Sequence, residues 1–154
     1  MLEGFYMNEK GMTLIVKTIT RLTVGLIILF GIYIVSHGHL SPGGGFAGGV
    51  IIALSFIHIM LAFGKEIAFK KVNQAIASFF ESLGAILFIT LALIGIASGY
   101  FFLNFLSKGE PFTLFSSGLI PLYNLAICFK VGAGLFIIFI TLVLLKIPGE
   151  DSEK

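Results

Sequence analysis

The sequence predicts an all-α integral membrane protein with four transmembrane helices and both termini in the cytoplasm. Of its 154 residues, 57% are hydrophobic and only 12% are charged, and the mean hydropathy is +1.06. A soluble domain carries about 25% charged residues. The apolar residues gather in long blocks of about 18 or more, the length that predicts a membrane-spanning helix. We therefore expect no soluble domain.

The apolar blocks form one transmembrane domain with spans at residues 13–35, 45–64, 75–103 and 122–145. Each block is long enough to cross a hydrocarbon core of about 30 Å, and a helix satisfies its own backbone there. Lys17 and Arg21 near the start of the first block would also fit a signal peptide, but no small-residue cleavage site follows them. Polar residues at 148–154 predict a solvent-exposed tail.

The basic residues predict the side of the membrane that each end faces. Four spans put both termini on one side, together with Lys10, Lys17, Arg21, Lys65, Lys70, Lys71, Lys146 and Lys154. The other side has Lys108, and Lys130 lies inside the last span. Basic residues are enriched in cytoplasmic segments. We therefore expect both termini in the cytoplasm, and the segments after the first and third spans outside.

A glycine-rich segment, HGHLSPGGGFAGG at residues 37–49, joins the first two spans. Part of it fits the G-x-G-x-x-G pattern of dinucleotide-binding proteins, which requires a preceding strand in a sheet. Here the pattern follows a membrane span, so we exclude a nucleotide site. His37 and His39 are too few for a closed metal site, and no Cys, Asp or Glu lies near them in the sequence. We expect neither a metal nor a cofactor.

The same segment has the composition of a closely packed helix start. Proline suits a helix N-terminus, where its missing N–H costs nothing. Glycines four residues apart make a thin helix face that another backbone can approach, in this chain or in a neighbouring one. We expect a packing role for this segment and for the glycines of the last span: Pro42, Gly43, Gly44, Gly45, Gly48, Gly49, Gly132 and Gly134.

Three ionisable side chains lie inside the spans, where a charge costs about 2.5–3.5 kcal/mol on insertion scales. Lys130 is the deepest, and the small residues Ala126 and Gly134 share its face of the helix. His58 and Glu81 lie nearer the cytoplasmic ends of their spans. We expect Lys130, His58 and Glu81 either to line an ion pathway or to form static polar pairs. One specific hypothesis is that His58 contacts Glu81 across antiparallel helices.

The sequence offers no catalytic constellation. It has one cysteine, Cys128, and its first aspartate is at position 151. Its longest basic run is Lys70–Lys71, without interleaved aromatic residues, so nucleic acid is excluded as a partner. We expect a chain without enzymatic activity of its own, surrounded by lipid and other membrane helices.

Two stretches, HGHLSPGGGFAGGVI at 37–51 and NLAICFKVGAGLF at 124–136, resemble the MnhB family, whose members are subunits of the Mrp-type multisubunit sodium/proton antiporters. The resemblance covers nearly the whole chain. It implies a four-helix subunit of the prokaryotic cell membrane that has no independent transport activity. Such a protein works alongside larger antiporter subunits in moving Na⁺ and H⁺.

Related modules occur in membrane-bound hydrogenases and sulfur-reducing complexes, which couple ferredoxin oxidation to ion pumping. Bacterial antiporter members tend to carry an acidic residue around the position of Lys130, so the lysine favours the module of a respiratory complex. The resemblance implies an accessory subunit of a Mrp-type cation/proton antiporter module that contributes to Na⁺/H⁺ translocation and to assembly. The alternatives are a purely structural assembly subunit and a small homodimeric transporter that acts alone.

Overall fold

The chain folds into long helices, as the computed structural model shows for residues 12–64, 74–107, 109–110, 113 and 116–144. The helices of this described part are α1 (Leu14–Ser36), α2 (Gly44–Phe63), α4 (Gln74–Ile94), the short 3-10 helix η2 (Gly95–Ser98) and α5 (Ile120–Leu144). The four α-helices are long and apolar enough to cross a membrane. The predicted all-α class with four spans is therefore confirmed, while the tail at 148–154 lies outside the described residues.

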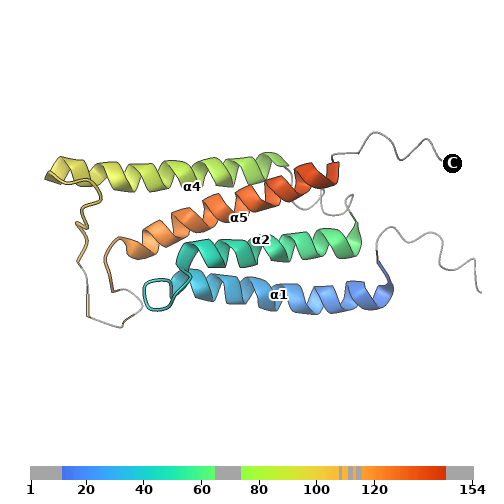
Figure 1. Ribbon diagram of the computed structural model, residues 1–154. Helices are drawn as coiled ribbons and strands as arrows, with labels where there is room; N and C mark the ends of the chain where they lie inside the picture. Colours follow the sequence, from blue (N-terminus) through green and yellow to red (C-terminus); the bar gives the residue numbers. More distant parts are fainter. Residues whose placement is uncertain (1–11, 65–73, 108, 111–112, 114–115, 145–154) are drawn as a thin grey trace, which may run out of the picture.

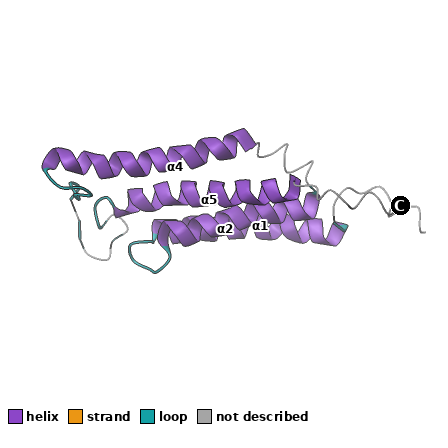
Figure 2. Ribbon diagram, turned by 45° about the horizontal axis from the view of Figure 1, so that its top comes forward, coloured by secondary structure: helices purple, strands orange, loops and turns teal. Residues whose placement is uncertain are grey.

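The helices lie side by side in the order α1, α2, α5, α4 (Figure 1). The last helix of the chain is thus inserted between α2 and α4, and α1 also touches α5. A second view, in which α1 and α2 overlap, again shows α4 at the edge beyond α5 (Figure 2). Only 17–33% of the residues in an 18-residue window of each span are buried, so the helices enclose little core. A row this thin leaves large apolar surfaces for lipid or for neighbouring chains.

Glycines set the spacing between α2 and its two neighbours. A Cβ atom on Gly49 would lie 3.0 Å from the carbonyl oxygen of Cys128 and 3.2 Å from the backbone nitrogen of Gly132 on α5. A Cβ on Gly45 would overlap the backbone of Asn124, also on α5. On another side of α2, a Cβ on Gly48 would crowd α1, 2.9 Å from the carbonyl oxygen of Gly31. Both interfaces of α2 therefore depend on missing side chains.

The start of α2 lies two residues later than Pro42. Gly43 precedes the first turn and has a φ of 123°, a backbone conformation that residues other than glycine rarely adopt. Pro42 therefore lies just before the helix rather than inside its first turn. The backbone N–H of Gly45 donates to Oδ1 of Asn124 at 3.2 Å, which satisfies one of the amide groups that a helix start leaves unpaired.

The third span is shorter than predicted. Its apolar run reaches Leu103, but α4 ends at Ile94 and η2 at Ser98. Gly99 follows with φ 96°, a left-handed conformation that ends the helix. The chain then folds back, with the N–H of Phe102 donating to the carbonyl of Ala92 at 3.4 Å. Because the residues that fold back are as apolar as those of the helix, hydropathy does not show where the helix ends. The predicted end of the third span at residue 103 is therefore too late.

The α2–α5 contact can be tested with one methyl group. We expect Gly45→Ala to lower the free energy of unfolding by about 1–3 kcal/mol, because the methyl group overlaps the backbone of Asn124. The matched control is Gly25→Ala in α1, where an added Cβ meets nothing within 4 Å. Thermal unfolding of both variants in detergent measures the difference. Equal stability of the two variants would contradict a tight α2–α5 contact.

Candidate functional site

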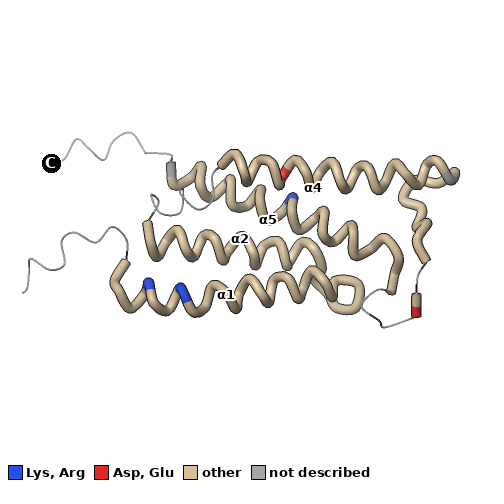
Figure 3. The backbone as a smooth tube through the Cα atoms, turned by 180° about the vertical axis from the view of Figure 1, so that it is seen from behind, with Lys and Arg blue, Asp and Glu red and all other residues tan. Residues whose placement is uncertain are grey.

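An ion pair joins α4 and α5 within the membrane-spanning part of the row. Nζ of Lys130 donates to Oε1 of Glu81 at 2.6 Å. Lys130 is ten residues from the start of α5, about 15 Å at 1.5 Å per residue, and so lies near the middle of a core of about 30 Å. In Figure 3 a basic position on α5 lies beside an acidic position on α4, away from the ends of both helices. The pair thus lies at a depth where charge is costly.

A glycine brings the two helices together beside this pair. A Cβ on Gly84 would lie 2.6 Å from the backbone nitrogen of Lys130 and 2.6 Å from the carbonyl oxygen of Ala126. The backbones of α4 and α5 therefore approach closely one turn from Glu81. This short distance lets the side chain of Lys130 on α5 reach the Glu81 carboxylate on α4. The pair is still partly open, since 49% of the Lys130 side chain and 33% of the Glu81 side chain remain exposed.

His58 does not join this pair. Its Nε2 hydrogen-bonds with Oγ1 of Thr20 on α1 at 3.2 Å, and Thr20 is only 1% exposed. The hypothesised contact between His58 and Glu81 is therefore wrong. The physical reason is the helix order, because α2 and α4 lie on opposite sides of α5. Each of the two titratable groups instead finds a polar partner on the helix next to its own.

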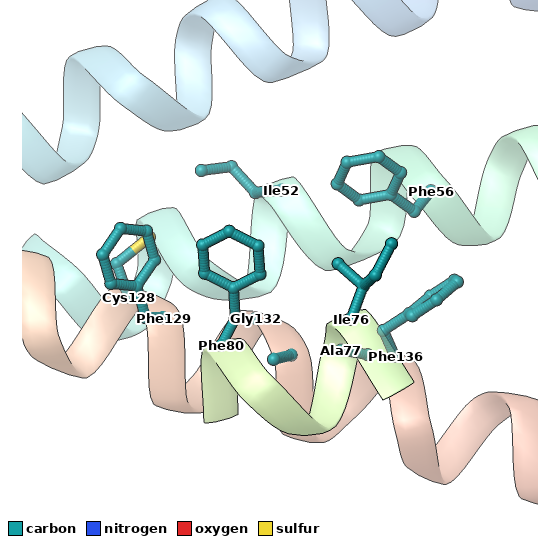
Figure 4. Close-up of a pocket in the computed structure, with 10 residues that line it drawn as sticks. Ile52, Phe56, Ile76, Ala77, Phe80, Cys128, Phe129, Gly132 and Phe136 are labelled. Atoms are coloured by element: carbon teal, nitrogen blue, oxygen red, sulfur yellow. The ribbon is translucent and has the colours of Figure 1, made fainter. Parts of the chain in front are cut away.

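An apolar groove of about 290 Å³ lies between α2, α4 and α5. It is lined by Ile52, Phe56, Ile76, Ala77, Phe80, Cys128, Phe129, Gly132, Ala133 and Phe136 (Figure 4). Neither Lys130 nor Glu81 is among these residues. Hydrocarbon side chains and one thiol offer no group that would coordinate a sodium ion. The groove is thus a poor candidate for ion chemistry, in contrast to the ion pair.

The two histidines before α2 bind backbone groups. Nδ1 of His37 hydrogen-bonds with the carbonyl of Tyr33 at 3.1 Å, and Nε2 of His39 with the carbonyl of Thr113 at 3.1 Å. Within the described residues, no group of three or more His, Cys, Asp or Glu side chains could hold a metal ion. His39 therefore connects the loop to Thr113, whereas His37 bonds within the last turn of its own helix.

Two polar residues that the sequence did not single out organise these contacts. Thr20 is the partner of His58, and Asn124 is the acceptor for the start of α2. The signal for Asn124 in the sequence is that its polar amide stands in an otherwise apolar block. Thr20 was not visible, because membrane helices commonly satisfy a threonine hydroxyl with their own backbone, as Thr18 does with the carbonyl of Leu14.

Comparison with known proteins shows what the chain is related to. Residues 15–137 match the family described as "domain related to MnhB subunit of Na+/H+ antiporter". The chain belongs to the MnhB family. It is 33% identical to a Na(+)/H(+) antiporter subunit of Bacillus subtilis over 155 residues, which cover 95% of this chain and 100% of that protein. The MnhB resemblance seen in the sequence is confirmed.

Two archaeal proteins extend the MnhB comparison. An uncharacterized protein of Methanocaldococcus jannaschii is 33% identical over 141 residues, 84% of this chain and 53% of that protein. A chain in the structure of the membrane-bound sulfane sulfur reductase, an archaeal respiratory membrane complex, matches with a TM-score of 0.70 and 32% identity. That match covers 86% of this chain and 60% of the solved one. The chain thus spans little more than half the length of these two relatives.

The MnhB match and the four apolar helices make the chain a multi-pass protein of the cell membrane. They do not bear on the individual side chains, so the roles of Lys130, His58 and Glu81 stay predictions.

The His58–Thr20 contact provides a test of the polar pairing between α1 and α2. We expect Thr20→Val, which keeps the side-chain shape, to lower the free energy of unfolding by about 1 kcal/mol because His58 loses its partner. Thr18→Val is the matched control, since that exposed hydroxyl bonds only within its own helix. Chemical unfolding in detergent compares the two. If both variants unfold alike, the hydrogen bond does not hold the two helices together.

Proposed function

We propose that the chain is a non-catalytic accessory subunit of a Mrp-type cation/proton antiporter module. It contributes to Na⁺/H⁺ translocation and to the assembly of the complex, alongside other membrane subunits. Two relatives support this: one is named as an antiporter subunit, and the other belongs to a respiratory membrane complex. The observation that carries the ion-pathway part is the half-open Lys130–Glu81 pair near the middle of the membrane.

The exposure of the pair favours a pathway over a fixed structural bridge. A pair sealed between helices would be out of reach of a passing ion, and its burial would cost the desolvation of both charges. Here 49% of the lysine side chain stays open, at a depth where each charge costs about 2.5–3.5 kcal/mol in lipid. Within reach of a cation that passes along this face, the ammonium and the carboxylate would set the local potential. His58, paired with Thr20, is a further polar contributor to the same module.

The parent complex is either an antiporter or a ferredoxin-linked membrane-bound hydrogenase or sulfur-reducing complex. The lysine at position 130, in the KVGAGL context of residues 130–135, favours the respiratory complexes. The solved chain of the archaeal sulfur reductase complex is 32% identical and the Bacillus subtilis antiporter subunit 33% identical, so sequence identity supports both parents equally.

One observation favours the second candidate function, a purely structural assembly subunit. The 2.6 Å contact already gives Lys130 and Glu81 a partner each, so the pair would hold α4 to α5 without any part in transport.

Transport by the assembled complex separates the two functions. We expect Lys130→Met to abolish Na⁺-dependent proton transport per assembled complex in membrane vesicles, because the ammonium is lost from the pathway. Lys130→Arg is the matched control, since it keeps the positive charge near Glu81 but cannot release a proton. Loss of transport in both variants would indicate proton transfer by the amine, and loss in the Met variant alone would indicate a need for fixed charge. Unchanged transport in the Met variant would eliminate the pathway role.

We also propose that both termini face the cytoplasm. The start of α1 and the end of α5 lie at the same end of the row, as four spans require (Figure 1). Basic residues gather in the segments on that side, and Lys108 is the one basic residue between the third and fourth spans.

Thiol labelling of whole cells tests this orientation. In a Cys128→Ala background, we expect Ser107→Cys to react with a membrane-impermeant maleimide in intact cells. Thr13→Cys, at the exposed start of α1, should react only after the cells are broken. Labelling of the Thr13→Cys variant in intact cells would reverse the orientation.

A further inference from the structure

The surface around Lys130 and Glu81 differs from the remaining membrane-facing surface. Large exposed side chains on the helices are mostly aliphatic or aromatic, such as Leu26 at 67% and Leu29 at 64% exposure on α1, and they suit lipid. The ion pair instead presents an ammonium and a carboxylate at mid-membrane depth. Hydrocarbon tails offer these groups neither charge nor hydrogen bonds.

The lysine still has hydrogen-bonding capacity to fill. An ammonium has three N–H donors, and one of them is used by Glu81 at 2.6 Å. In the part of the chain that the structure describes, no second acceptor lies on Nζ of Lys130. Whatever covers this face must therefore supply oxygen atoms at the depth of Lys130.

Beside the lysine, Gly134 leaves space that the described helices do not use. It lies one turn after Lys130 on the same side of α5. A Cβ on Gly134 would meet nothing within 4 Å, whereas a Cβ on Gly84 or Gly132 would meet the backbone of a neighbouring helix. The other two glycines are thus explained by contacts inside this chain, and Gly134 leaves room for a backbone from outside it.

The opposite side of α5 has the reverse character. Leu125, nine residues before Gly134, lies about 180° around the helix at 100° per residue. That side carries the groove whose lining is hydrocarbon apart from one thiol, and it leaves no donor or acceptor unmatched in lipid. The charged side alone therefore requires a polar partner.

We propose that the face formed by Glu81, Lys130 and Gly134 docks a transmembrane helix of another subunit. The backbone of that helix packs over Gly134, and its side-chain or carbonyl oxygens accept hydrogen bonds from Lys130. The proposal rests on the proposed function only in placing the chain inside a complex, and it does not require an ion to pass here.

Site-specific photocrosslinking in the intact complex tests this docking face. A benzophenone side chain replaces Ile138, which shares the face with Gly134, and Leu125 is replaced in the control on the other side of α5. We expect the probe at position 138 to form a covalent adduct with a different subunit. The probe at position 125 should not form that adduct. An adduct with lipid alone, or with a second copy of this chain, would overturn the proposal. So would reaction of Gly134→Cys with a water-soluble maleimide, which would indicate a water-filled cavity.

A charge-swapped variant provides the second test. Exchanging both residues, Lys130→Glu with Glu81→Lys, retains an ion pair between α4 and α5 but presents a carboxylate where the partner offers oxygens. We expect the swapped chain to reach the membrane at its usual level and to lose its association with the other subunits during affinity purification. Assembly at the usual level would overturn the proposal. Crosslinking without any transport defect in Lys130→Met would refute the pathway while leaving the docking face intact.

Discussion

The close backbone contact between α2 and α5 determines the arrangement of the other helices. It forms where Gly45 and Gly49 let α5 approach to the distance of touching backbones. Once α5 occupies this position, α4 packs against α5. Gly84 of α4 lets the two backbones approach at Ala126 and Lys130. The ion pair between α4 and α5 and the separation of His58 from Glu81 both follow from that order. In a bilayer such contacts rely on packing rather than on the hydrophobic effect, because lipid is as apolar as the helices.

The sequence was sufficient to predict the number of spans and most of their bounds, but not which helices contact one another. Length and hydropathy are local properties, so Leu14–Ser36 and Gly44–Phe63 could be placed to within about a residue of their bounds. The end of α4 depends on one backbone angle at Gly99, which hydropathy does not detect. The contacts of His58 depend on which helices are neighbours, and four apolar helices of similar length pack in many orders. Glycine spacing indicated thin faces, yet it did not show that the face of Gly49 meets α5.

The two sides of the α4–α5 part of the row have different chemistry. One side presents a groove of hydrocarbon side chains, and the other presents an ammonium paired with a carboxylate. A protein that functions alone in lipid has no reason to place charge on its outer surface at mid-membrane depth. The asymmetry agrees with a family whose named members are subunits of antiporters. It also explains why so small a fraction of each span is buried within the chain itself.

The helix order also has a consequence for how the protein is made. The hydrogen bond between Gly45 and Asn124 joins residues 79 positions apart in the chain. The translocon therefore releases α2 into the membrane before the helix that covers its glycine face has been synthesised. The α1–α2 hairpin forms first, and α4 follows without its neighbour. Insertion of the final helix then completes the row, because within the described residues α5 makes the main contacts with both α2 and α4. A chain that ends before residue 120 would lack the helix that packs against both α2 and α4.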